Sequence, residues 1–231
     1  MGEEMRAHFH EELRRLEQRT LDGLDLVVRA LNRVLAAVRD RDMELAQLVI
    51  DDDDLLDGRY LEVHRELLAL IATQAPVASD LRLVAALLHL IRIIERMGDQ
   101  CVNVAKLIPL VGHDPPVDER LGDYVRRMGA QVRTLILQAR RAFAERDVAL
   151  ARDLVRGDDL VDELNRECFR RAIAIGEDED RREWAVTMIL AGRALERIGD
   201  QAVDIGEQVA FLVTGLFEEF EDASHPEASR V

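Results

Sequence analysis

Cysteine, proline, glycine and aromatic residues are all scarce in this chain. Its 231 residues include 2 cysteines, 5 prolines and 13 glycines, and only 4% are aromatic. Cys101 and Cys168 form no CxxC pair, which argues against a disulfide framework and indicates a reduced, cytoplasmic protein with buried thiols. Because helix breakers are rare and leucine, alanine, arginine and glutamate are abundant, the composition predicts an all-α fold.

Positive charge and long apolar runs are lacking as well. Lysine and arginine together number 31 against 46 acidic residues, a net charge of −15 that repels nucleic-acid phosphate. The most apolar run, residues 81–94, is interrupted by Arg82, His89 and Arg92, and it falls short of the roughly 20 apolar residues that a membrane span needs. No apolar leader opens the chain. We therefore expect a soluble protein with neither a nucleic-acid partner nor direct membrane insertion.

The chain contains an internal repeat. Residues 95–101 (ERMGDQC) match residues 196–202 (ERIGDQA), and residues 42–57 match residues 147–162. A stretch with three of the five prolines, residues 109–122, lies between the copies and indicates a linker. The predicted organisation is a first three-helix bundle over 1–110, a linker over 111–118, a second three-helix bundle over 119–217, and a disordered acidic tail over 218–231.

Each copy is predicted to hold three antiparallel helices. The first helix spans about 6–38 in one copy and about 119–144 in the other. Asp42 and Asp147 are placed to cap the N-termini of the second helices. Pro76 ends the second helix of the first copy, and Ser79 or Asp80 is expected to cap the third. The fold class is therefore two tandem, internally repeated three-helix bundles.

Acidic residues recur four apart on the second and third helices of each copy. Residues four apart share a helix face, and residues equidistant from a hairpin turn lie side by side. In the first hairpin, Asp57 is opposite Glu95 and Asp53 is opposite Asp99, and the midpoint of each pair is residue 76. In the second hairpin, Asp162 is opposite Glu196 and Asp158 is opposite Asp200, and both midpoints are residue 179. Four carboxylates should therefore converge in each bundle: Asp53, Asp57, Glu95 and Asp99 in the first, and Asp158, Asp162, Glu196 and Asp200 in the second.

Clusters of carboxylates need neutralising charge. Oxygen-only ligands suit Mg²⁺, Ca²⁺ or Mn²⁺, and carboxylate clusters also hold iron, so we predict two metal sites. Asn103 and Asp204 extend the acidic rows by one turn, and Gly98 and Gly199 indicate close helix approach beside them. The alternative is neutralisation by nearby arginines, namely Arg92, Arg96, Arg193 and Arg197.

These residues resemble the PhoU family of bacterial phosphate-transport accessory and regulatory proteins. The resemblance rests on QAPVASDLRLV (74–84), ERMGDQCVNVA (95–105), ERIGDQAVDIG (196–206) and the acidic segments that precede the two repeated motifs. It implies two similar three-helix bundles, with metal clusters held by the motif acids. Iron, magnesium, manganese and zinc are all candidate cations. The ligand set it implies is the eight acids above, with Asn103 and Asp204 as secondary ligands.

The resemblance also implies a function. A protein of this family is expected to be a cytoplasmic negative regulator of phosphate uptake and of the phosphate-starvation response. Its expected partners are the ATPase subunit of a phosphate ABC transporter and a sensor histidine kinase, which would hold it peripherally at the membrane. A homodimer or higher oligomer is expected, and an enzymatic activity is not.

Two alternatives from other functional classes stay open. A carboxylate-bridged di-metal enzyme is disfavoured because the Glu-x-x-His motif of ferritin-like sites does not occur in the sequence. A metal-free helical adaptor would replace the cations with arginine–carboxylate networks. An apolar rim of Phe211, Leu212, Leu216 and Phe217 could serve oligomerisation or could pack the end of the bundle.

Overall fold

The computed structural model describes residues 2–73, 76, 78–111 and 118–220, and within them every regular element is helical. The all-α prediction is thus confirmed. The first bundle consists of α1 (Gly2–Asp40), α2 (Met43–Asp51), α3 (Asp53–Thr73) and α4 (Ala78–Leu107), followed by the 3₁₀ turn η1 (Ile108–Val111). The second consists of α5 (Glu119–Glu145), α6 (Val148–Arg152), α7 (Leu154–Ile175) and α8 (Glu179–Thr214).

The predicted caps of the middle segments are present. The Asp42 carboxylate accepts a hydrogen bond from the backbone N–H of Leu45, and Asp147 accepts one from Leu150, both at 2.9 Å. Each cap satisfies a donor that the first turn of a helix leaves unpaired. The cap expected at Ser79 or Asp80 is wrong, because α4 already begins at Ala78 and includes both residues. Pro76 lies outside the helices, in the turn where it was predicted.

The middle helix of each bundle was predicted to be continuous, and this detail is wrong. It is interrupted at Asp52 between α2 and α3, and at Asp153 between α6 and α7. Asp52 belongs to a run of four aspartates, residues 51–54, and aspartate is a poor helix former because its side chain competes for backbone hydrogen bonds. The Asp52 carboxylate instead forms an ion pair with Arg33 of α1.

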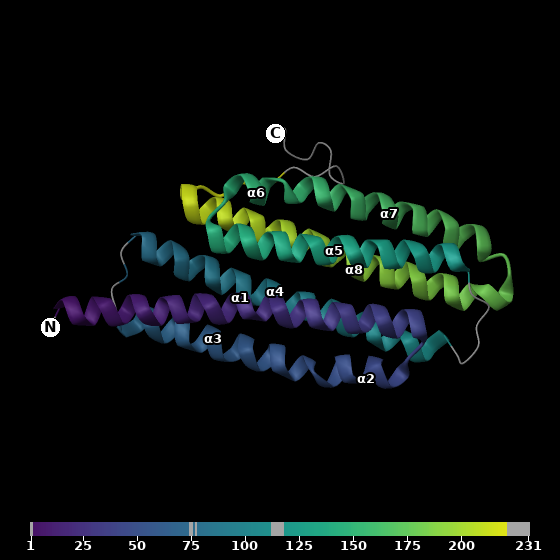
Figure 1. Cartoon of the computed structure of the whole chain (residues 1–231), viewed down its shortest axis with the longest axis horizontal. Coiled ribbons are helices and arrows are strands. Elements are labelled where there is room, and N and C mark those ends of the chain that lie inside the picture. Colours follow the sequence, from purple (N-terminus) through teal and green to yellow (C-terminus); the bar gives the residue numbers. More distant parts are fainter. Residues whose placement is uncertain (1, 74–75, 77, 112–117, 221–231) are drawn as a thin grey trace.

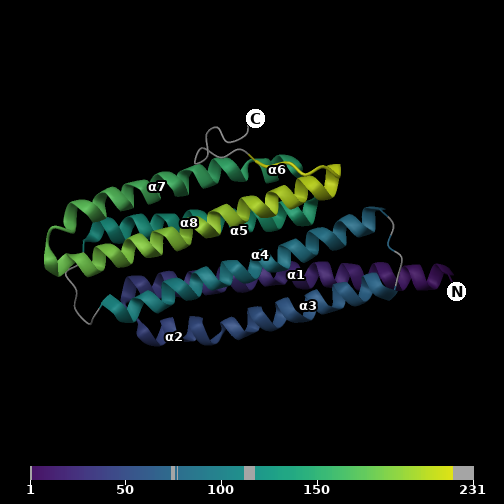
Figure 2. The ribbon, with the colours of Figure 1, turned by 180° about the vertical axis from the view of Figure 1, so that it is seen from behind.

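The two bundles stack along their lengths. In both views of the ribbon the first bundle forms one layer and the second bundle the other (Figures 1 and 2). Helices α4 and α8 pack against each other across the seam, and α1 packs against α5. The core is made of fully buried side chains, such as Leu24, Leu31 and Leu87 in the first bundle and Leu121 and Phe143 in the second. None of the helices in the described residues is long and apolar enough to cross a membrane.

The end of α8 combines packed and exposed apolar residues. Phe211 is buried and stacks on Phe217 with 4.1 Å between ring centroids, whereas Leu216 and Phe217 are largely exposed. Beyond α8 the chain turns back, since the backbone N–H of Phe220 donates to the Glu207 carboxylate at 2.8 Å. Phe211 therefore packs the bundle end, and any role of the exposed pair in oligomerisation stays a prediction.

Two predicted segments fall largely outside the described residues. The linker was expected over 111–118, of which 112–117 are not described. The acidic tail was expected to be disordered over 218–231, of which 221–231 are not described. The described beginning of that tail is in contact with the bundle, because Glu218 forms an ion pair with Arg152 at 2.6 Å.

Gly206 allows α6 to lie against α8. An ideal Cβ built at this position would be 2.9 Å from Leu154 Cδ1 and 3.0 Å from the backbone oxygen of Ala151. The backbone oxygen cannot move without shifting α6, so the close approach depends on the missing side chain.

We expect Gly206→Ala to lower the free energy of unfolding by about 1–3 kcal/mol, because the new methyl group overpacks the contact. Gly58→Ala is a matched control, since a Cβ at Gly58 in α3 meets nothing within 4 Å. That control should stabilise the protein by about 0.5–1 kcal/mol through helix propensity. Urea unfolding followed by circular dichroism measures both, and equal effects of the two substitutions would contradict the close approach.

Candidate functional site

The first acidic cluster lies where α3 crosses the middle of α4. Asp53 begins α3 and Asp57 follows one turn later, while Glu95 and Asp99 lie on α4. An ideal Cβ on Gly98 would lie 2.5 Å from Leu56 Cδ1 and 3.3 Å from Asp53 Oδ1. The lack of a side chain at Gly98 therefore allows α3 and its Asp53 carboxylate to pack directly on α4, which confirms the close approach predicted for this glycine.

Burial and like charge both act on this cluster. Burial, reinforced by the neighbouring carboxylates of Asp57, Asp99 and Glu95 and opposed by Lys106, raises the pKa of Asp53 to about 6. Since these three acids all act on Asp53, the structure brings the four carboxylates of the first bundle together, as the hairpin register predicted. The pKa of Glu95 is likewise raised, first by burial and then by Asp99 and Asp57, against the opposing charges of two arginines.

The first cluster has a net excess of negative charge. Arg92 and Arg96 act on Glu95 only through space. Within the described residues, no arginine or lysine forms an ion pair within 4.0 Å of any of its four acids. Asp57 and Asp99 are exposed, so their carboxylates can change rotamer. The cluster is thus open to a cation from solvent.

The second cluster is built on the same plan but lies deeper. Asp158 is 2% exposed, Asp162 and Glu196 are each 8% exposed, and Asp200 is half-buried. An ideal Cβ on Gly199 would clash with Asp158 Oδ1, just as one on Gly98 would meet Asp53. The two copies therefore share one contact, an aspartate of the middle helix seated on the glycine of the E-R-x-G-D motif.

Arginines partly neutralise the second cluster. Arg193 donates a hydrogen bond to Glu196 Oε1, and Arg166 lies 3.9 Å from Asp162. Burial, reinforced by Asp200 and opposed by Arg193, raises the pKa of Glu196 to about 7. The other carboxylate oxygen of Glu196, Oε2, is buried and accepts no hydrogen bond from the described residues. This arrangement agrees in part with the arginine alternative.

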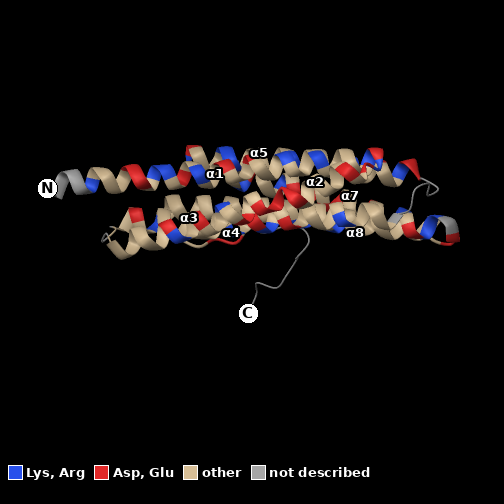
Figure 3. Ribbon diagram, turned by 90° about the horizontal axis from the view of Figure 1, so that it is seen from below, with Lys and Arg blue, Asp and Glu red and all other residues tan. Residues whose placement is uncertain are grey.

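Asn103 and Asp204, the predicted secondary ligands, are both exposed. Partial desolvation raises the pKa of Asp204, and Arg96 of the opposite bundle lowers it. Arg96 directly follows Glu95 in the motif of the first copy. Its interaction with Asp204 therefore shows that the acidic regions of the two bundles face the same interface between α4 and α8. From below, acidic residues gather near the middle of the molecule, around the labels of α4 and α7 (Figure 3).

The donor chemistry of the clusters fits a hard cation, but the carboxylates are not already arranged as a coordination shell. In the part of the chain that the structure describes, no group of three or more His, Cys, Asp or Glu side chains is placed to hold a metal ion. Carboxylate oxygens in excess over positive charge suit magnesium, manganese or iron better than zinc, which favours His and Cys ligands. A cation would therefore have to draw the exposed carboxylates inward.

The thiols take no part in this chemistry. Cys101 and Cys168 are fully buried, as predicted, and burial raises their pKa values to about 12 and about 11. The sequence reasoning missed Arg166, although its position four residues after Asp162 on the same helix could have indicated the ion pair.

Comparison with known proteins finds a family model, relatives and solved structures that match this chain. The family model of the PhoU domain matches this chain twice, over residues 21–108 and 125–209. The chain is 31% identical over 221 residues to the phosphate-specific transport system accessory protein PhoU homolog 1 of Mycobacterium leprae, covering 93% of this chain and 96% of that protein. It is 30% identical over 210 residues to the protein of the same name from Thermotoga maritima, covering 90% of each.

Two crystal structures have the same fold. The structure of PhoU from Pseudomonas aeruginosa superimposes with a TM-score of 0.83 at 32% identity, covering 90% of this chain and all of that one. The phosphate transport system regulatory protein PhoU from Streptococcus pneumoniae superimposes with a TM-score of 0.84 at 25% identity, covering 91% and 99%. The names of these relatives describe accessory and regulatory proteins.

The raised pKa of Glu196 predicts how stability depends on pH. The pKa of an unfolded glutamate is about 4.3, whereas burial raises the pKa of Glu196 in the folded chain to about 7. Between these values the folded chain keeps a proton that the unfolded chain has lost, so this group makes folding less favourable as pH rises. Glu196→Gln removes the charge, and we expect it to raise Tm at pH 8 by about 2–4 °C, with little change at pH 5.

The measurement is thermal unfolding of protein treated with a chelator, at both pH values. Glu163→Gln, on an exposed position of α7, is the control and should leave the pH dependence unchanged. A Glu196→Gln variant that is no more stable than the original chain at pH 8 would show that Arg193 already neutralises this carboxylate.

Proposed function

The chain belongs to the PhoU family, and we propose that it is a metal-binding regulatory protein of phosphate-specific transport. Family membership agrees with the resemblance predicted from the duplicated E-R-x-G-D motif. The regulatory role is supported by the names of the relatives, which are accessory or regulatory proteins of phosphate transport. The proposed action is negative regulation of phosphate uptake and of the phosphate-starvation response, without a catalytic step.

The observation that carries the metal proposal is the unneutralised first cluster. Burial and the neighbouring carboxylates raise the pKa values of Asp53 and Glu95, and no ion pair with a described arginine or lysine offsets the negative charge of the cluster. A bound divalent or trivalent cation would supply that charge and would tie α3 to α4. Asp53 and Glu95 are the half-buried anchors of the proposed site, and the exposed Asp57 and Asp99 are its adaptable ligands.

The second cluster is proposed to bind a cation in competition with arginine. Asp158, Asp162, Glu196 and Asp200 would be its ligands, and Arg193 would have to release Glu196 first. The ion pairs of Arg193 and Arg166 also favour a second candidate function, in which the second bundle is a metal-free adaptor stabilised by an arginine–carboxylate network.

Partners and location follow from the family and are proposals for this chain. We infer that it acts in the cytoplasm and reaches the membrane through proteins, namely the ATPase subunit of a phosphate ABC transporter and a sensor histidine kinase. A homodimer is also proposed, for which the exposed apolar end of α8 is one candidate surface.

Metal content tests the site directly. Protein purified without chelator should contain iron, manganese or magnesium by mass spectrometry, and Asp53→Asn combined with Asp99→Asn should lower that content by the share of the first cluster. Asp54→Asn is the control, because Asp54 is exposed on the same helix and lies outside the cluster. Equal metal content in the double variant and the original chain would exclude the first cluster as the site.

Gene deletion tests the regulatory role separately. A strain lacking this chain should express phosphate-starvation genes in high phosphate, measured with a transcriptional reporter, because the negative regulator is gone. Expression of the original chain should restore repression. Unchanged reporter output in the deletion strain would contradict the proposed role, whatever the metal content.

A further inference from the structure

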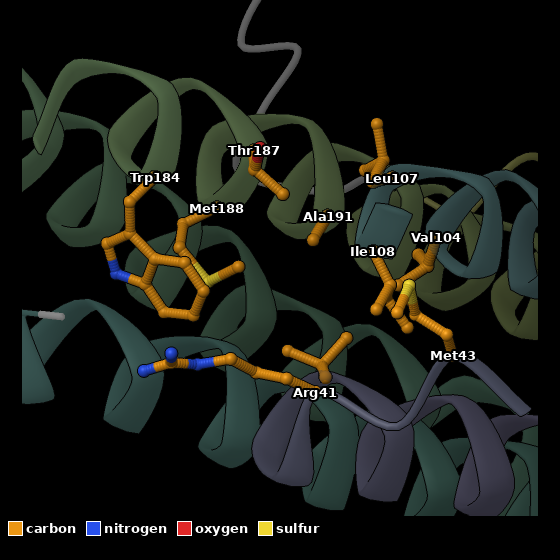
Figure 4. A pocket seen from close by; sticks show the side chains of 10 residues that line it. Arg41, Met43, Val104, Leu107, Ile108, Trp184, Thr187, Met188 and Ala191 are labelled. Atoms are coloured by element: carbon orange, nitrogen blue, oxygen red, sulfur yellow. The ribbon is translucent and has the colours of Figure 1, made fainter. Parts of the chain in front are cut away.

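The molecule also has two adjoining cavities with mostly apolar linings, where the two bundles pack against each other. The smaller cavity has a volume of about 130 Å³ and lies between the turn after α1, the end of α4 and the start of α8. Figure 4 shows Trp184, Met188 and Ala191 of α8 on one side of it, with Met43 and Ile108 opposite. A dry cavity of about 150 Å³ is large enough to hold benzene, so this one has room for about six carbon atoms.

The larger cavity adjoins the first and has a different chemistry. Its volume is about 450 Å³, and it shares Val38, Arg41 and Trp184 with the smaller one. Its charged lining consists of Arg39, Arg41 and Arg126 together with Glu119 and Asp123. Arg39 is paired with Asp40 and Arg126 with Asp123, and Arg41 is the charged residue that lines both cavities.

Trp184 lines both cavities, and its indole N–H has no hydrogen-bond acceptor among the described residues. Its side chain is 5% exposed, and its indole Nε1 is buried. A buried donor without a partner costs free energy, and a ligand with an acceptor atom at this position would remove that cost. In Figure 4 the indole nitrogen lies on the same side of the cavity as the guanidinium of Arg41.

The geometry points to a binding site for an amphiphilic anion with a short aliphatic chain, held at the seam of the two bundles. The chain occupies the smaller cavity, where Met43 and Met188 adapt to an unbranched tail. The anionic head lies beside Trp184, where it accepts hydrogen bonds from the indole N–H and from Arg41. Pockets of this kind, mostly apolar with a few convergent polar groups, are typical of ligand sites between domains.

Trp184 makes the test direct, because it is the single tryptophan of the chain. Octanoate titrated into the full-length protein should change the Trp184 fluorescence saturably, with one site per chain by calorimetry. Octanol should bind about tenfold more weakly, because it lacks the charged head. Octanoate should also raise Tm, since a ligand of the folded state stabilises it.

Two variants locate the site. Ala191→Leu places three more carbons in the smaller cavity and should abolish binding, whereas Ala130→Leu on an exposed position of α5 should not. Arg41→Gln should weaken octanoate binding about tenfold without changing octanol binding, and Arg156→Gln, 85% exposed on α7, is its control. If Ala191→Leu does not fold by circular dichroism, the Arg41→Gln pair decides alone.

A further experiment with phosphatidylglycerol vesicles distinguishes a membrane lipid from a free acid as the ligand. If the protein cosediments with the vesicles and either Ala191→Leu or Arg41→Gln abolishes this, the ligand is a membrane lipid. If the protein binds octanoate but does not cosediment, the ligand is a free acid. Three results overturn the proposal: no saturable response to octanoate, equal affinity for octanol and octanoate, or octanoate binding that both variants retain.

Discussion

The contact between an aspartate and a glycine is the constraint on which both acidic clusters depend. In each bundle an aspartate of the middle helix packs on the glycine of the E-R-x-G-D motif. Asp53 packs on Gly98, and Asp158 packs on Gly199. A side chain at either glycine would push the helices apart. Because the helices touch here, the neighbouring acids of both helices are brought into one region. Burial and then like charge raise the pKa values of Asp53 and Glu196.

The acidic clusters of the two copies differ in how far arginines neutralise them. Position 166 in the second copy is an arginine that reaches Asp162, whereas the offset of 105 residues places Leu61 at the equivalent position of the first. Arg193 hydrogen bonds Glu196, whereas its counterpart Arg92 acts on Glu95 only through space. The first cluster is consequently short of positive charge, whereas the second, which lies deeper, is partly neutralised. A cation is therefore better suited to the first cluster than to the second.

Local features of the sequence predicted most of the fold. The caps at Asp42 and Asp147 and the turn at Pro76 depend on residues a few positions apart, and the hairpin register follows from them. The interruption at Asp52 was not predicted, because it reflects poor helix propensity in a window that looked amphipathic. The deep burial of Asp158 was not predictable either, since it depends on how the helices of the second bundle pack around it. Trp184 had no signal at all: its counterpart in the first copy is Leu83, an ordinary apolar residue.

Helix α8 carries both the tryptophan that lines the cavities and an acid of the second cluster. It carries Trp184 near its start and Glu196 twelve residues later, which places them about 18 Å apart along one continuous helix. The same helix packs on α4 of the other bundle, where Arg96 acts on Asp204. A ligand beside Trp184 and a cation at either cluster would therefore both act on the packing of α8 against α4. If the two bind one arrangement of that seam more tightly than another, each changes the affinity for the other by the same factor. The packing of α8 on α4 is thus the element that would couple the proposed ligand to the proposed cation.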